Sequence, residues 1–131
     1  MKIAALAGRL LFSMIFLLSG ASLFGTATVG YAASQGVPLA SVLVPISGVM
    51  CILGGISILL GYKTSIGAIL IVVFMVPVTL VFHSFWNVAD PAARQTQMIE
   101  FLKNISILGG ALIFLVHGAG PYSLDSRADR Q

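Results

Sequence analysis

GYKTSIGAILIVVFMVPVTLVFHSFWNVADP, residues 61 to 91, decides the fold of this chain. No charged residue lies between Lys63 and Asp90, and the run that follows Lys63 is almost entirely apolar. Such a run can cross a bilayer as a helix, because a span needs about 20 residues. The tight connection at Tyr62–Lys63 joins it to a second apolar run, so the two helices are antiparallel neighbours. The stretch therefore predicts a helical hairpin in a membrane.

The rest of the chain extends this pattern to four spans. Of the 131 residues, 58% are hydrophobic and 8% are charged, whereas soluble domains carry about 25% charged residues. Too few polar side chains exist to cover a water-exposed surface, so lipid is part of the solvent. The apolar stretches cover about residues 3–24, 39–61, 64–85 and 98–117. We expect an all-α integral membrane fold, a four-transmembrane-helix bundle, with one domain over residues 1–120 and a polar cytoplasmic tail over 121–131.

Two features of the first half refine this picture. The segment TATVGYAASQGVP, residues 26–38, is small, uncharged and ends with Gly36 and Pro38, which predicts a short interfacial helix between the first two spans. The N-terminal "MK", the apolar core and "YAAS" resemble a secretory signal, but Arg9 interrupts the core and the segment is too long. We expect this segment to remain as the first transmembrane helix, with Arg9 snorkelling to the interface.

The basic residues indicate orientation rather than a nucleic-acid partner. They are scattered and form no stripe for phosphate backbones. With the N-terminus inside, the cytoplasmic side receives Lys2, Arg9, Lys63, Arg127 and Arg130, and the other side receives Arg94 and Lys103. The positive-inside rule thus predicts a multi-pass protein of the cell inner (plasma) membrane with both termini cytoplasmic.

Polar side chains gather where the third span ends and the fourth helix begins. Asp90-Pro91 is typical of a helix N-cap followed by proline at the first helical position. The spacing places one set of residues on each of two facing helices, and these are the candidate ligand residues: Thr79, His83 and Trp86 on the third, and Gln97, Glu100, Lys103 and Asn104 on the fourth. We expect a small polar pocket between these helices, bordered by Phe82, Phe85, Trp86 and Phe101.

Four of these residues also have a simpler interpretation. Glu100 and Lys103, three apart on one helix, can form an ion pair that makes insertion tolerable, although intramembrane charges often mark a functional site. Trp86 is typical of an interfacial anchor, and His83 of a helix-capping group. No complete catalytic constellation and no carboxylate–histidine cluster with metal spacing is present, and Cys51 alone permits no internal disulfide.

Four segments together resemble the bacterial DoxX family: GRLLFSMIFLLSG (8–20), GVP (36–38), FHSFWN (82–87) and FLKNISILGGAL (101–112). The resemblance runs to about residue 118. It implies a four-helix inner-membrane protein tied to a quinone-linked oxidase, and it matches His83, Trp86, Lys103 and Asn104 to recurrent positions of that family. Members often carry a lysine shortly after the Ser-Gly of the first helix, where this chain has Leu23.

Two hypotheses about function follow. In the first, the chain is a membrane subunit of a quinone-linked redox system, at most an oxidoreductase subunit, which needs a redox partner protein because the chain supplies no electron carrier. In the second, it is a non-enzymatic membrane scaffold or a small-molecule transport or accessory protein. The small size of the chain also suits a homo-oligomer, and pairs of small residues four apart, such as Ser106 and Gly110, let helix backbones approach closely.

Overall fold

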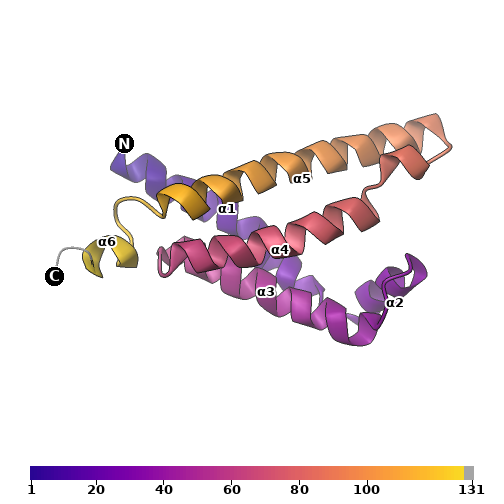
Figure 1. The fold of residues 1–131 in the computed structure, drawn as a ribbon, viewed down its shortest axis with the longest axis horizontal. Coiled ribbons are helices and arrows are strands. Elements are labelled where there is room, and N and C mark those ends of the chain that lie inside the picture. The colour runs from indigo at the N-terminus through magenta and orange to yellow at the C-terminus, as the bar shows by residue number, and fades with distance from the viewer. Residues whose placement is uncertain (129–131) are drawn as a thin grey trace.

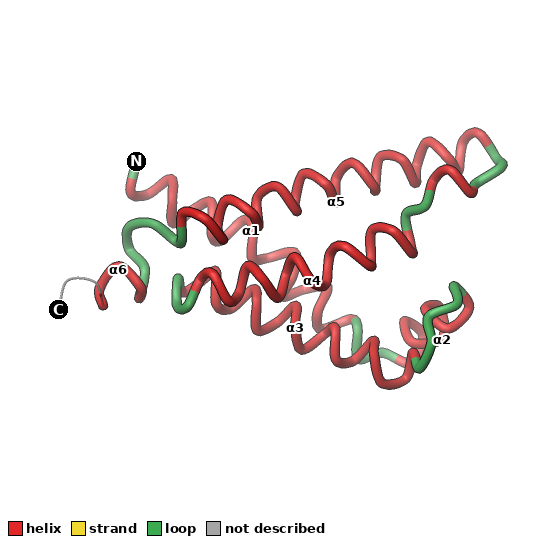
Figure 2. Tube along the Cα trace, in the orientation of Figure 1, coloured by secondary structure: helices red, strands yellow, loops and turns green. Residues whose placement is uncertain are grey.

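Four long helices make up the body of the protein. The computed structural model describes residues 1–128, and its long helices are α1 (Lys2–Ser22), α3 (Ala40–Leu60), α4 (Thr64–Phe82) and α5 (Pro91–His117). Three short elements complete the chain: α2 (Thr26–Ser34), the 3-10 helix η1 (Phe85–Asn87) and α6 (Leu124–Ala128). All four long helices are long and apolar enough to cross a membrane, and the described residues contain no strand (Figure 2). The predicted four-helix membrane fold is confirmed.

The long helices pack as neighbours in chain order, α1 on α3, α3 on α4 and α4 on α5. The N-terminus and α6 lie at one end of the bundle, and α2 lies at the opposite end (Figure 1). We call these the α6 end and the α2 end. At 1.5 Å per residue, the 27 residues of α5 extend about 40 Å, which is enough to cross a hydrocarbon core of about 30 Å with a turn or two to spare.

The bundle has a narrow interior and an apolar exterior. Phe16, Cys51, Ile58 and Ile71 lie in the main core cluster, which draws on α1, α3, α4 and α5. Many large apolar side chains are instead exposed along the outer faces of all four long helices, for example Leu10, Leu53, Ile66 and Val116. In a membrane these side chains contact lipid rather than water, so their exposure carries no penalty.

Two glycines let α1 and α3 cross closely. A Cβ atom built on Gly20 would lie 3.1 Å from the carbonyl oxygen of Gly48, and one built on Gly48 would lie 3.0 Å from that of Gly20. The backbones therefore touch at this point with no side chain between them. Helix association in lipid relies on such van der Waals contact, because burial of apolar groups gives no driving force there.

The connection between α4 and α5 is partly as predicted. Asp90 caps α5, its Oδ2 accepting a hydrogen bond of 2.9 Å from the Ala93 N–H, and Pro91 occupies the first turn. The third span, however, ends as an α-helix at Phe82 rather than near Phe85, and η1 follows after a two-residue break. Trp86 therefore does not share a helix with Thr79, because the backbone changes course at His83.

The segment Gly118–Ala128, which we call the strap, folds back across the α6 end. Asp125 fixes it to the start of α4: its carboxylate accepts hydrogen bonds from the Lys63 N–H (2.8 Å), the Thr64 N–H (3.0 Å) and the Thr64 hydroxyl (2.8 Å). The Asp125 N–H in turn donates to the carbonyl of Gly61 at 2.8 Å. The strap thus closes the turn between α3 and α4.

Arg9 does not snorkel. Only 1% of its surface is exposed, and its Nη2 donates to the carbonyl oxygen of Tyr122 in the strap at 2.7 Å. Snorkelling requires an open path from the side chain to water. The strap occupies that path, so the expectation of an interfacial guanidinium was wrong.

Candidate functional site

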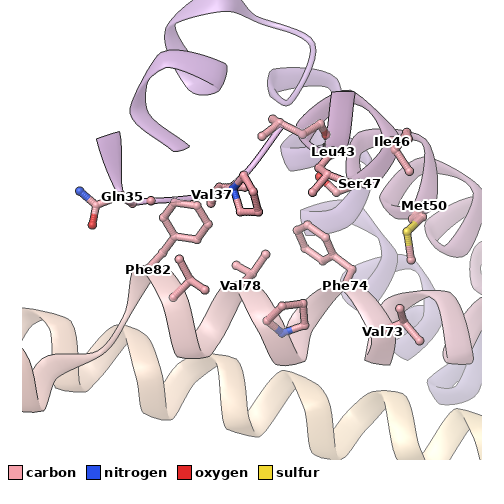
Figure 3. Close-up of a pocket in the computed structure, with 15 residues that line it drawn as sticks. Gln35, Val37, Leu43, Ile46, Ser47, Met50, Val73, Phe74, Val78 and Phe82 are labelled. Carbon is pink, nitrogen blue, oxygen red and sulfur yellow. Dashed lines mark hydrogen bonds between the residues drawn. The ribbon is translucent and has the colours of Figure 1, made fainter. Parts of the chain in front are cut away.

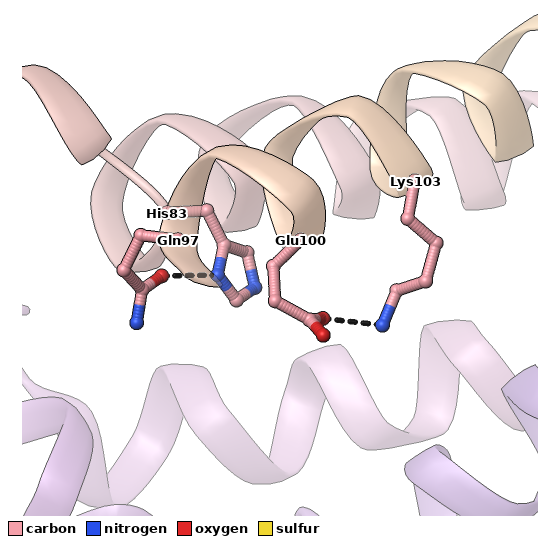
Figure 4. A network of polar contacts seen from close by, with 4 residues as sticks. All are labelled: His83, Gln97, Glu100 and Lys103. Carbon is pink, nitrogen blue, oxygen red and sulfur yellow. Dashed lines mark hydrogen bonds and ion pairs between the residues drawn. The ribbon is translucent and has the colours of Figure 1, made fainter. Parts of the chain in front are cut away.

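His83 and Gln97 join the end of α4 to the first turns of α5. The Nδ1 atom of His83 lies 2.9 Å from Oε1 of Gln97 (Figure 4). His83 is the C-cap residue of α4, where its own N–H donates to the carbonyl of Thr79. With the amide oxygen of Gln97 toward the ring, Nδ1 donates this hydrogen bond. The pair is half-buried and leaves one imidazole nitrogen for another partner.

Glu100 and Lys103 form an ion pair about one turn further along α5, on the same side of the helix as Gln97 (Figure 4). Their side chains remain 37% and 49% exposed, respectively. An ion pair at this depth lowers the cost of placing both charges in a bilayer. The pair predicted from their spacing forms, and its carboxylate and ammonium face open space rather than the core.

Three aromatic rings hold η1 against α5. Phe85, Trp86 and Phe101 contact one another edge to face, with ring centroids 5.2 to 5.7 Å apart. Such arrangements are favourable beyond the area that they bury. The Trp86 ring is half-exposed, as an interfacial anchor would be. This cluster fixes the connection between α4 and α5.

Two adjoining cavities open at the α2 end. The larger, about 440 Å³, lies between α3, α4 and the segment that links α2 to α3, and its walls are almost wholly apolar (Figure 3). The smaller, about 280 Å³, is bounded by α2, α3 and α4, by Leu23 at the end of α1, and by Gln97 of α5. Five residues form walls of both: Val44, Ser47, Phe74, Val78 and Phe82. One side chain layer therefore separates the two spaces.

Most of the polar side chains that line the two cavities belong to the smaller one. His83 and Gln97 line it on one side, and Thr28, Tyr31 and Ser47 line it from α2 and α3. The Tyr31 ring stacks on Phe82 with a centroid distance of 5.8 Å, so the aromatic wall continues from α4 to α2. An apolar volume beside a small polar volume suits a molecule with a long apolar part and a polar end.

The structure separates the predicted site residues into groups. His83 and Gln97 line a cavity, whereas Thr79 and Asn104 are buried within the helices and Trp86 belongs to the aromatic cluster. Of the four aromatic residues predicted to border the pocket, only Phe82 does so. The cavities also lie chiefly between α2, α3 and α4, rather than between α4 and α5 as predicted.

Thr28, Tyr31 and Ser47 line the smaller cavity but were not predicted from the sequence. Tyr31 stands out in its segment as the one aromatic residue of α2, and that was the available signal. Its proximity to α4 depends on how α2 folds back, which no local pattern reports. Among residues 1–128, no group of three or more His, Cys, Asp or Glu side chains could hold a metal ion.

Comparisons with known proteins relate the chain to inner-membrane proteins of Escherichia coli. It is 32% identical to the inner membrane protein YphA over 100 residues, which cover 76% of this chain and 71% of that protein. It is 30% identical to the inner membrane protein YqjF over 129 residues, covering 94% of this chain and 90% of the relative. No solved structure matches the chain.

A third similarity extends to an animal protein. The chain is 28% identical to the Surfeit locus protein 4 homolog of Drosophila melanogaster over 69 residues, which cover 52% of this chain and 26% of that longer protein. A family model described as the SURF4 family matches residues 2–130.

This match overturns the resemblance to the DoxX family, which was wrong. That resemblance rested on four short segments, none of which is specific to one family by itself. The link to a quinone and to an oxidoreductase loses its support with it. The four apolar helices and the E. coli relatives instead establish a multi-pass inner-membrane protein. With a family model matched over residues 2–130, the chain belongs to the SURF4 family.

Proposed function

We propose that this protein is a non-enzymatic membrane protein that binds an amphipathic small molecule at its α2 end, in a transport or accessory role. The pair of adjoining cavities carries the proposal. A long apolar chain fits the larger cavity, and a polar end group fits the smaller one beside His83 and Gln97. The wall that they share, including Val78 and Phe82, would contact both parts of the ligand.

The polar residues are arranged to recognise rather than to react. Nε2 of His83 and the hydroxyls of Thr28 and Tyr31 can hydrogen-bond an end group, and the Glu100–Lys103 pair presents one charge of each sign nearby. A nucleophile with an adjacent base and an oxyanion-stabilising group would be needed for hydrolysis. The cavity walls do not offer that arrangement, whereas hydrogen bonding and apolar contact are sufficient for binding.

Filling the shared wall tests the proposal. Val78→Trp places a large ring where the two cavities meet, and Val76→Trp places the same ring on the exposed face of the same helix. The protein would be purified from E. coli membranes in mild detergent and examined by native mass spectrometry for bound lipid-like molecules. We expect wild type and Val76→Trp to retain such a molecule, and Val78→Trp to retain at least about tenfold less.

Two results would count against this function. Either wild type carries no amphipathic molecule after mild purification, or Val78→Trp retains it as well as Val76→Trp does. The helical content and size-exclusion profile of both variants would be measured to show that each remains folded. His83→Ala and Gln97→Leu should weaken retention less than Val78→Trp, because they remove polar contacts and leave the apolar cavity open.

We also propose an orientation, with both termini in the cytoplasm and the α2 end facing outward. The α6 end carries Lys2, Arg9, Lys63 and Arg127, whereas Arg94 and Lys103 lie toward the α2 end. Lys and Arg are retained preferentially on the cytoplasmic side. The binding cavities would then open toward the outer leaflet.

A further inference from the structure

A second polar constellation lies at the α6 end, far from the cavities. Arg9 and Ser13 sit one turn apart on the same face of α1, and only 1% and 0% of their surfaces are exposed. One hydrogen bond, from Arg9 Nη2 to the carbonyl of Tyr122, holds the guanidinium. Nε and Nη1 of Arg9 and Oγ of Ser13 are buried without a hydrogen-bond partner.

Among residues 1–128, no carboxylate forms an ion pair with Arg9. A buried charge normally requires a partner, because its removal from water costs several kcal/mol even after relaxation. Asp125 is the carboxylate of the strap, and its oxygens are taken by Lys63 and Thr64. Within residues 1–128, the one ion pair joins Lys103 to Glu100, on another helix. Arg9 and Ser13 therefore offer unused donors to an acceptor that comes from elsewhere.

The closed strap leaves no room for that acceptor. A Cβ atom on Gly61 would lie 2.6 Å from Nη1 of Arg9 and 2.8 Å from Cβ of Ala119, and it would also clash with Ser123. The guanidinium is thus packed between the end of α3 and the strap. The strap is held down by the cap that Asp125 makes at the start of α4, by the hydrogen bond from Arg9 to Tyr122, and by the burial of Ala119 and Ser123.

We propose that Arg9 and Ser13 form a binding site for a phosphate group, with the strap Gly118–Ala128 as its cover. A guanidinium presents parallel N–H donors that match two oxygens of a phosphate, and a serine hydroxyl can donate to a third. Once the strap lifts, the phosphate replaces the Tyr122 carbonyl as the partner of Arg9.

The location favours a phosphate carried by a lipid. Arg9 lies about 10 Å along α1 from Lys2, at 1.5 Å per residue, a depth that head groups at the α6 end can approach. Lys2, Lys63 and Arg127 are exposed at the same end and attract anions. Basic pockets between transmembrane helices bind phosphate-bearing head groups in this way. Phosphatidic acid, which has a terminal phosphate, and free inorganic phosphate share the required chemistry.

Native mass spectrometry of the full-length protein in mild detergent tests the site. The probes are phosphatidic acid, phosphatidylcholine of the same acyl chains, and inorganic phosphate as a competitor. We expect wild type to bind phosphatidic acid over phosphatidylcholine. Asp125→Asn, which loosens the strap while leaving Arg9 in place, should bind phosphatidic acid at least about threefold better. Arg9→Gln should bind about tenfold less, and Ser13→Ala should show a smaller loss.

The controls separate this site from general surface charge. Lys2→Gln and Arg127→Gln each remove an exposed cation at the same end and should change binding by less than about twofold. If either reduces binding as much as Arg9→Gln does, or if Arg9→Gln binds as well as wild type, the proposal is wrong. It is also wrong if neither wild type nor Asp125→Asn binds any probe.

Competition by inorganic phosphate would assign the site to free phosphate, and lack of competition to the lipid. The site is independent of the function proposed for the α2 end, because Val78→Trp should leave it intact.

Discussion

Asp125 is a single carboxylate whose hydrogen bonds connect the strap to the bundle. Partial burial raises its pKa, but the hydrogen bonds from the N–H and hydroxyl of Thr64 and from the N–H of Lys63 outweigh burial, so its pKa lies below the ordinary value. A carboxylate with a lowered pKa stabilises the folded state above its unfolded pKa of about 3.9, and this contribution is lost as the pH falls through the folded value. Docking of the strap should therefore be complete at neutral pH and weaken below about pH 4.

Hydrogen exchange measures this effect directly. Amides of residues 118–128 should lose protection as the pH falls below about 4, after correction for the intrinsic rate of exchange. In Asp125→Asn, which has no titrating group at this position, the same amides should exchange quickly at every pH. Equal pH dependence in wild type and in this variant would show that another group controls the strap.

His83 and Gln97 form the one side chain hydrogen bond that joins the end of α4 to α5 among the described residues. A typical hydrogen bond contributes about 1 kcal/mol to stability. A double-mutant cycle with His83→Ala and Gln97→Ala should therefore give a coupling free energy of about 1 kcal/mol in detergent unfolding. Gln95→Ala, two residues away and exposed on the same helix, should show no coupling to His83→Ala. Coupling of equal size at Gln95 would mean that the effect is one of helix propensity.

At the level of the elements, the crossing of α1 and α3 depends on Gly20. A Cβ atom there would lie 2.8 Å from Cγ1 of Ile52 and 3.0 Å from Cβ of Cys51, so Gly20→Ala should force the helices apart at a cost of about 1–3 kcal/mol. Gly8→Ala is the matched control, because it makes the same change on the same helix where no atom lies within 4 Å. Alanine is the better helix former, so Gly8→Ala should unfold at or above the wild-type temperature and Gly20→Ala well below it. Similar unfolding temperatures for the two variants would contradict this account of the crossing.

The sequence predicted those helices and helix ends that are determined by residues close together in the chain. Four apolar runs specify four helices because each must satisfy its own backbone in lipid, and Asp90-Pro91 specifies the start of α5 because capping involves adjacent residues. The end of α4 at Phe82 was missed because the sequence HSFWN contains no Gly or Pro to stop a helix. The strap was missed for a different reason: Asp125 meets Thr64 across 61 residues, a distance over which periodicity and capping signals carry no information.

At the scale of the whole molecule, the same lack of long-range information explains which parts of the candidate site could be predicted from the sequence. His83 and Gln97 were identified from sequence, since polar residues are conspicuous in an apolar chain. The cavities were not, because their walls come from the segment that links α2 to α3 and from faces of α3 and α4 that are apolar like any others. Arg9 was assigned to the interface because the sequence does not reveal that the strap covers it. The sequence therefore predicted some of the polar side chains that line the site, but it did not predict which segments enclose the cavities or cover Arg9.

The orientation of the whole molecule can be tested with two single cysteines. Cys51 is buried, and replacing it by Ala leaves a background without cysteine. Ala92→Cys then reports the α2 end and Ala128→Cys the α6 end, and both positions are exposed. Since Lys and Arg favour the cytoplasmic side, a membrane-impermeant maleimide added to E. coli spheroplasts should label Ala92→Cys at once and Ala128→Cys only after lysis. The opposite pattern would turn the phosphate site outward and the cavities of the α2 end inward, and would leave the binding chemistry proposed for each end unchanged.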